Sequence, residues 1–341
     1  MIEMLMVSTN DYPVTYQTLG PLDSPISEIV VDSDDNVYAL EGKQNSTDSI
    51  RKISSSGVEI WGVEQGGGRS LILDSNEKLY IGRTSLSIEK RNSLDGTEVT
   101  ENGWPYQYEP HIYSSIYNMT IDAYGSIYYR NLGGDNEEDK VVKVSSDGYE
   151  VTSENWPIVQ TYNREFHDLG ADHTNDHIYM LDYDTARKFN LDGSEIVDSN
   201  WPIVFSSIVN GITVDSNTQS IYVARDHYIY KYFFDGTLDW SYISNDFNER
   251  FITIALDDSG YLYAGANYTS VGADDSIVRK ISPSGSEVTT ENWPHIHPAK
   301  TNSLVCSNTY VFGGFGYVDS PQGDQAVKKF SSDGTLQWEF V

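Results

Sequence analysis

The sequence predicts an all-β fold in which seven similar units of four antiparallel strands close into a ring. Three observations predict it: all seven tryptophans follow a glycine turn at a fixed spacing, the turn glycines recur every 39 to 52 residues, and helical periodicity is absent. A repeat in the forties with four short strands per unit is typical of the blade of a β-propeller. One unit cannot bury both of its faces alone, whereas seven units in a ring can. We therefore expect a seven-bladed β-propeller.

The tryptophans fall into two groups by their distance from the turn. Three lie four residues after the glycine, and four lie eight residues after it and precede a proline; they are Trp61, Trp240 and Trp338, and Trp104, Trp156, Trp201 and Trp293. Both spacings are even, so on an extended strand all seven rings point to the same face. The spacing predicts a structural tryptophan in the fourth strand of every blade.

The other three strands also have recurring features. The first is an apolar run that ends in an acid, as at Ile29–Asp32, and we expect it to be buried on both faces. The second carries a tyrosine in six units, and the third carries a lysine, as at Tyr38 and Lys52. We interpret the lysines as exposed partners of the surplus carboxylates, each pair contributing about 0–1 kcal/mol.

The repeats extend over residues 26–341, and no linker divides them, so one domain is expected there. Residues 1–25 precede the repeats and are predicted to form an N-terminal arm that docks on a partner, or an extra strand that clasps the ring. Connections of the second to the third strand and links between blades are long and irregular. Propeller topology places both on one face, here named the long-loop face; the opposite face, with the tight turns, is named the tight-turn face.

The charge restricts the partners. The chain has 51 acidic and 22 basic residues, a net charge of −29, which argues against nucleic acid and anionic membranes. No membrane span or secretory signal is evident at the start of the sequence. Self-repulsion of this size is relieved where salt shortens screening to roughly 3 Å, at about 1 M. A salt-rich environment is favoured, with an acidic mesophilic protein as the alternative.

The three short units resemble the repeats of the PQQ-like (WD-repeat-like) β-propeller family. They read Ser56–Trp61, Asp235–Trp240 and Asp333–Trp338, each with Gly-x-x-x-Trp. The resemblance implies that the indole docks on the neighbouring blade. It implies no activity, because such repeats occur in dehydrogenases, scaffolds and adhesive virion proteins. The acidic composition is similar to that of haloarchaeal proteins and of their tailed viruses.

Aromatic residues are frequent in the segments expected on the long-loop face. Tyrosine and phenylalanine offer rigid contact area for a protein or a sugar, but they could instead seal the gaps between blades. The candidate ligand-binding residues are Tyr106, Tyr108, His111, Tyr113, Tyr162, Phe247, Tyr268, Phe315 and Tyr317.

Metal-binding patterns are weak. His295 and His297 would lie on one side of a strand, and His167, His173 and His177 cluster in sequence, but exposed histidines are the preferred interpretation. The acidic run Asp135–Asp139 could hold a structural calcium or magnesium ion, or could be a solvated loop. No cofactor and no catalytic motif is indicated.

These features favour a non-enzymatic recognition module that binds a host cell-surface protein or glycan through the long-loop face. The acidic surface and the apparent lack of a signal peptide suggest a virion component at a tail, fibre or capsid vertex, located on the virion surface and so extracellular. Residues 1–25 would contact other virion proteins. The alternatives are a propeller enzyme of the lyase or lactonase type, with a metal at the channel mouth, and a cytoplasmic assembly scaffold.

Overall fold

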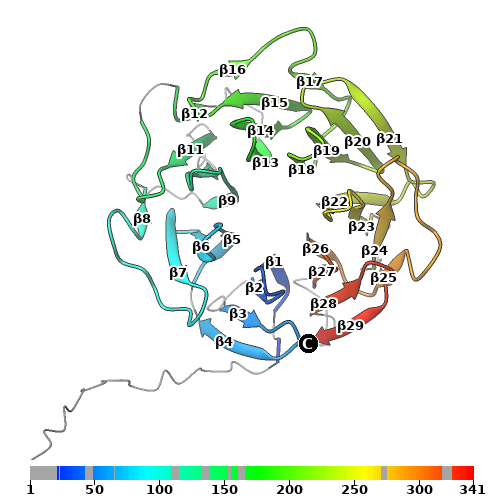
Figure 1. Ribbon diagram of the computed structural model, residues 1–341, viewed down its shortest axis with the longest axis horizontal. Coiled ribbons are helices and arrows are strands. Elements are labelled where there is room, and N and C mark those ends of the chain that lie inside the picture. Colours follow the sequence, from blue (N-terminus) through cyan, green and yellow to red (C-terminus); the bar gives the residue numbers. More distant parts are fainter. Residues whose placement is uncertain are drawn as a thin grey trace, which may run out of the picture.

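The computed structural model contains seven antiparallel sheets in a ring, six of four strands and one of five, which confirms the predicted seven-bladed β-propeller (Figure 1). It describes residues 21–22, 24–42, 49–64, 66–108, 115–131, 139–152, 155–159, 166–269, 275–316 and 325–341. No helix occurs among these residues. None of them therefore belongs to a helix of the length and hydropathy of a membrane span.

Each blade consists of consecutive strands, and the innermost strand comes first in the chain. The strands of blades 1 to 4 are β1 (Ile26–Val31), β2 (Val37–Glu41), β3 (Ser49–Ile53) and β4 (Glu59–Glu64); β5 (Gly68–Leu73), β6 (Lys78–Arg83), β7 (Ser87–Asn92) and β8 (Tyr106–Gln107); β9 (Ile116–Ile121), β10 (Ile127–Asn131), β11 (Lys140–Val144) and β12 (Ile158–Val159); and β13 (Phe166–Asp172), β14 (His177–Asp182), β15 (Thr185–Asn190), β16 (Glu195–Ile196) and β17 (Ile203–Val204).

The strands of blades 5 to 7 are β18 (Gly211–Asp215), β19 (Ser220–Arg225), β20 (Tyr228–Phe233) and β21 (Leu238–Ile243); β22 (Glu249–Leu256), β23 (Leu262–Tyr268), β24 (Ser276–Ile281) and β25 (His295–His297); and β26 (Thr301–Cys306), β27 (Tyr310–Phe315), β28 (Ala326–Ser331) and β29 (Leu336–Phe340). The ring closes where β1 packs against β26 and β27. Residues 1–20 lie outside the described residues, so their role as an arm or clasp stays a prediction.

Burial within a blade differs from the expectation for the first strand. In β1 only Ile26 and Ile29 are buried, and the other four residues are half-buried. The innermost strands surround the axis of the ring, so one face of each borders the channel (Figure 1). The strands behind the first are more enclosed: every residue of β2, β3 and β10 is buried.

All seven tryptophans join neighbouring blades in the same way. Each indole N–H donates a hydrogen bond of 2.9–3.2 Å to a backbone carbonyl in the turn before the last strand of the next blade. The pairs are Trp61–Ser93, Trp104–Ser146, Trp156–Leu191, Trp201–Phe234, Trp240–Pro283, Trp293–Ser332 and Trp338–Ser55. The last pair connects blade 7 to blade 1. These contacts are named the indole seam.

The turn glycines make this contact possible. Gly285 has a φ of +84°, and a Cβ added to it would lie 2.7 Å from Cδ2 of Trp240. Only glycine adopts this conformation without cost and leaves room for the ring. Because the same geometry of turn and indole recurs in every blade, the number of glycine–tryptophan pairs in the sequence equals the number of blades.

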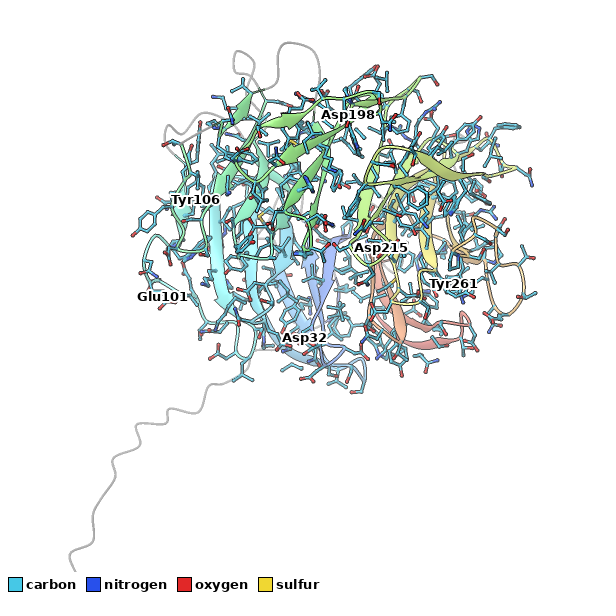
Figure 2. All side chains as sticks on the ribbon, turned by 45° about the horizontal axis from the view of Figure 1, so that its top comes forward. Asp32, Glu101, Tyr106, Asp198, Asp215 and Tyr261 are labelled. Carbon is cyan, nitrogen blue, oxygen red and sulfur yellow. The ribbon has the colours of Figure 1, made fainter. Side chains whose placement is uncertain are left out.

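The fourth strand is continuous in only three blades, and this corrects part of the prediction. Trp61, Trp240 and Trp338 lie within β4, β21 and β29. The four tryptophans with the longer spacing instead lie just before a short final strand, after a segment that leaves the sheet, and each is joined to its proline by a cis peptide bond. We name the residues that leave the sheet before these four tryptophans the extension. Two of them, Glu101 and Asp198, lie at the outer edge of the molecule (Figure 2). After the extension, the chain returns to the sheet and each indole takes its position in the indole seam.

Five of the seven repeated lysines are buried, and Lys90 and Lys143 are half-buried, contrary to the prediction that they are exposed. In five blades the ammonium group donates to the same carbonyl oxygen as the indole; these are Lys52, Lys143, Lys188, Lys280 and Lys329, with Nζ–O distances of 2.6–3.2 Å. In all seven blades the ammonium also lies within 4.9–5.8 Å of the ring centre of the tyrosine, or in blade 7 the phenylalanine, on the second strand. In four blades the lysine also pairs with a carboxylate, as the sequence predicted; the pairs are Lys52–Asp32, Lys231–Asp239, Lys280–Glu291 and Lys329–Asp35, at 3.1–3.5 Å. A carbonyl group and a π face are thus added to the predicted carboxylate partners.

Replacing Trp201 with alanine is expected to lower the free energy of unfolding by about 3–5 kcal/mol, because the buried ring and its bond to Phe234 are both lost. Val197 lies in the same extension and is 68% exposed, so Val197→Ala should change stability by no more than about 0.5 kcal/mol. Denaturant unfolding measures both. A loss below about 1 kcal/mol for Trp201→Ala would contradict a role of the seam in stability.

Candidate functional site: an axial pocket

Every innermost strand is irregular at the same level, close to its beginning. The register shifts there in six blades, in strands β1, β5, β9, β13, β22 and β26. In blade 5 two residues lie opposite Ala224. The carbonyl of Ala224 accepts the backbone N–H of Asn210, and Ala224 is also the strand partner of Gly211. β-Bulges re-aim side chains and often lie beside binding sites.

Two consecutive residues occupy each irregular position. They are Ser27–Glu28, Arg69–Ser70, Tyr117–Asn118, His167–Asp168, Asn210–Gly211, Ile252–Thr253 and Asn302–Ser303. Innermost strands run from the long-loop face toward the tight-turn face, so the seven bulges lie near the long-loop face.

The bulge residues enclose a hollow of about 250 Å³, here named the axial pocket. All seven blades contribute to it. Its walls consist of Ser27, Glu28, Arg69, Tyr117, Asn118, Asp168, Asn210, Ile212, Ile252, Thr253, Ile254, Asn302 and Ser303. Most of these side chains are polar, which suits a ligand that forms hydrogen bonds.

Hydrogen bonds between neighbouring bulges fix these walls. Between five pairs of neighbouring blades the pattern is the same: a side chain of one bulge accepts the backbone N–H of the next innermost strand. The acceptor–donor pairs are Glu28–Leu71, Ser70–Met119, Asp168–Ile212, Thr253–Leu304 and Ser303–Ile29, at 2.7–3.2 Å. Amide side chains join the other two pairs of blades, where Asn118 donates to Asp168 and Asn210 donates to the Phe251 carbonyl. This belt surrounds the axis completely.

Two carboxyl groups in the belt have raised pKa values. Burial raises the pKa of Glu28 to about 8; the N–H of Leu71 opposes the rise, and the negative charge of Asp168 adds to it. Burial also raises the pKa of Asp168 to about 6, although it accepts hydrogen bonds from Ile212, Leu169 and Asn118. Glu28 therefore holds a proton near neutral pH, and the pocket is less acidic than its composition suggests.

Two of the aromatic candidates are buried, and the structure removes them as ligand contacts. Tyr106 is 4% exposed, and its hydroxyl group contacts Tyr129 and Glu150 of the next blade (Figure 2). Phe315 is fully buried and stacks on His297 at 4.1 Å. Both rings seal the gaps between blades, which is the alternative that the sequence left open.

The other candidates differ in exposure. Phe247 is 75% exposed in the link between blades 5 and 6, and its ring meets that of His227 edge-on at 5.1 Å. Tyr108 and Tyr268 are half-buried. His111, Tyr113, Tyr162 and Tyr317 lie outside the described residues, so their part in binding stays a prediction.

The long loops are also unevenly distributed. Connections from the second to the third strand are short in blades 2, 4 and 5, where they span residues 84–86, 183–184 and 226–227. This corrects the expectation that all such connections are long. The exposed rings of Tyr183 in blade 4 and of Phe247 between blades 5 and 6 lie on the long-loop face.

A larger hollow of about 790 Å³ lies on the tight-turn face over blades 1 to 4. Its acidic groups already have structural partners: Oδ1 of Asp32, Asp74 and Asp122 accepts backbone N–H groups of the following turn, and Oδ2 accepts a tyrosine hydroxyl. Figure 2 labels Asp32 and Asp215, which end the innermost strands of blades 1 and 5. These carboxylates close hairpin turns, so we prefer the axial pocket as the functional site.

The histidines considered as metal ligands are dispersed. His295 and His297 both pack against blade 7, on Phe330 and Phe315, and burial lowers the pKa of His297 to about 4. Among the residues that the structure describes, no three histidine, cysteine, aspartate or glutamate side chains are placed to hold a metal ion. Residues 135–138 of the acidic run lie outside that part, and Asp139 pairs with Arg130.

The bulge residues were missed in the sequence, although a signal for them exists. A mostly polar pair precedes the apolar core of each innermost strand, as in Ser27–Glu28 before Ile29 and Asn302–Ser303 before Leu304. Aligning the seven repeats on the residue that follows the apolar run, an aspartate in six repeats and Ser307 in the seventh, would place these pairs at one level.

No protein-family model and no curated protein matches the sequence. Solved structures do match the fold. The structure of U3-55K is similar with a TM-score of 0.67 and 12% identity, over 91% of this chain and 96% of that chain. The β-propeller domain of Cps50 (Swd1) from Myceliophteria thermophila gives a TM-score of 0.62 and 9% identity, over 86% and 93%. At these identities the likeness concerns the fold alone.

Stability should depend on pH through Glu28. Its pKa lies above its ordinary value of 4.5, so the folded protein keeps a proton that the unfolded chain loses. The free energy of unfolding is therefore expected to fall between about pH 4.5 and pH 8 by roughly 2–4 kcal/mol. Glu28→Gln, which still accepts the Leu71 N–H, should remove this part of the fall in denaturant unfolding at several pH values. The exposed Glu101→Gln should not, and an unchanged pH profile in Glu28→Gln would contradict the assignment.

Proposed function

We propose that the protein is a non-enzymatic recognition module that binds a polar group of a cell-surface glycan or glycoprotein through the long-loop face. The axial pocket carries the proposal. All seven blades contribute residues to its wall, six of the innermost strands have a bulge at its level, and a closed belt of hydrogen bonds fixes the wall without a ligand. A preformed polar pocket binds with little loss of conformational entropy.

Aromatic residues around blades 4 to 6 support the same face. Phe247 and Tyr183 are 75% and 42% exposed, and Tyr228 lies beside His227 with ring centres 4.4 Å apart. Rings of this kind supply apolar contact area at low entropic cost. They would extend the contact from the axial pocket toward the edge of the molecule.

The acidic composition supports a wider proposal about the setting. With a net charge of −29, the chain suits a salt-rich medium, and we place it on a virion surface at a tail, fibre or capsid vertex. There it would attach the particle to its host, and residues 1–25 would contact other virion proteins. Nucleic acid and membrane insertion have no part in this proposal.

Binding to isolated host envelopes and to a glycan array in molar salt tests the function. The unmodified protein should be retained, and Phe247→Ala should weaken the binding about tenfold, because an exposed aromatic contact is lost. Leu94 is equally exposed, at 74%, but lies on the tight-turn face, so Leu94→Ala should bind normally. Absence of binding by the unmodified protein would reject recognition, and an equal loss in both variants would reject the assigned face.

A further inference from the structure

The arginines of this acidic chain divide into two kinds. Seven of those that the structure describes pair with carboxylates: Arg51, Arg83, Arg91, Arg130, Arg187, Arg225 and Arg279. Arg69 and Arg250 are exposed and, within the described part of the chain, pair with none. With 51 acidic residues available, an arginine without a carboxylate is unexpected. Arg69 lines the axial pocket, and Arg250 contacts Asn210, which lines it.

The positions of these two arginines are specific. Arg69 is the extra residue of the bulge in β5 and forms part of the pocket wall. Arg250 lies on β22, two residues before the bulge of blade 6, and its Nη2 donates a 2.8 Å hydrogen bond to Oδ1 of Asn210, which also lines the pocket. One arginine thus belongs to the pocket wall, and the other is hydrogen-bonded to a residue of that wall.

Within the described part of the chain, neither carboxyl group of the wall forms an ion pair with these arginines, although Asp168, with a pKa of about 6, keeps a negative charge near neutral pH. Both oxygens of Asp168 accept hydrogen bonds, from Leu169 and Asn118 at Oδ1 and from Ile212 at Oδ2. Glu28 accepts the N–H of Leu71, and its raised pKa keeps a proton on it near neutral pH. These groups belong to the belt between blades, which leaves both guanidinium groups available to a ligand.

We propose that the axial pocket binds an anionic saccharide residue, with the charged group held by Arg69 and assisted by Arg250. A guanidinium group recognises a carboxylate or sulfate through paired hydrogen bonds. Tyr117, Asn118 and Asn302 also face the pocket and offer a hydroxyl group and amide oxygens to the sugar hydroxyls. This inference names the ligand class and rests on the proposed recognition function.

Calorimetric titration in roughly 2 M salt tests the inference with two anionic probes, glucuronate and glucose 6-sulfate, and one neutral probe, glucose oligosaccharides. Both anionic probes, or one of them, should bind at least tenfold more tightly than the neutral one. Arg69→Gln should lower that affinity roughly 10- to 100-fold, and Arg250→Gln should lower it less. Lys78→Gln removes the same charge near the tight-turn face and should have no effect; thermal unfolding checks that all variants fold.

The outcomes separate this inference from the function on which it rests. Equal binding of glucose and glucuronate, or normal binding by Arg69→Gln, would overturn the anionic ligand while leaving glycan recognition in place. Retention on host envelopes without any dependence on Arg69 would have the same meaning. If the unmodified protein binds neither envelopes nor any saccharide, both proposals fail. The relative affinities for the carboxylate and the sulfate identify the charged group.

Discussion

The structure depends on a single contact repeated seven times, in which the indole of one blade donates a hydrogen bond to a turn carbonyl of the next. In five blades a lysine donates to the same oxygen, so one carbonyl receives two donors, one of them charged. Within the described residues, each blade is built from consecutive strands and no strand is exchanged to close the ring. Closure between blades 7 and 1 therefore relies on side-chain contacts such as Trp338 and Lys329 with Ser55.

The indole seam acts at the outside of the ring, and the belt of bulges acts at its axis. Because both sets of contacts join the same neighbouring blades, each blade is fixed to its neighbours near the axis and also near the outer edge. Its bulge therefore keeps its position along the axis of the ring. The axial pocket is then a consequence of the assembly rather than of any one loop. Its seven contributors are far apart in sequence, as with Ser27 and Asn302, and only the closed ring brings them together.

The fold was largely readable from the sequence, because glycine turns and tryptophans recur with the blade. The interrupted fourth strands could not be predicted. Spacings of four and eight residues are both even and place the tryptophan on the same face of a strand, so they do not reveal that the residues before Trp104 leave the sheet. Burial of Lys188, Tyr106 and Phe315 depends on the neighbouring blade, which no local pattern specifies. Bulge residues were missed for the same reason: a polar pair before Leu71 acquires meaning only when seven such pairs surround one axis.

The most direct test of this account is the exchange of the seven indole N–H protons with solvent, observed by nuclear magnetic resonance in the folded protein. Because every indole donates to a carbonyl of another blade, all seven should exchange more slowly than free indole and should lose protection together when the ring opens. Exchange of several indoles at the rate of free tryptophan, while the protein remains folded, would contradict a ring closed by this seam.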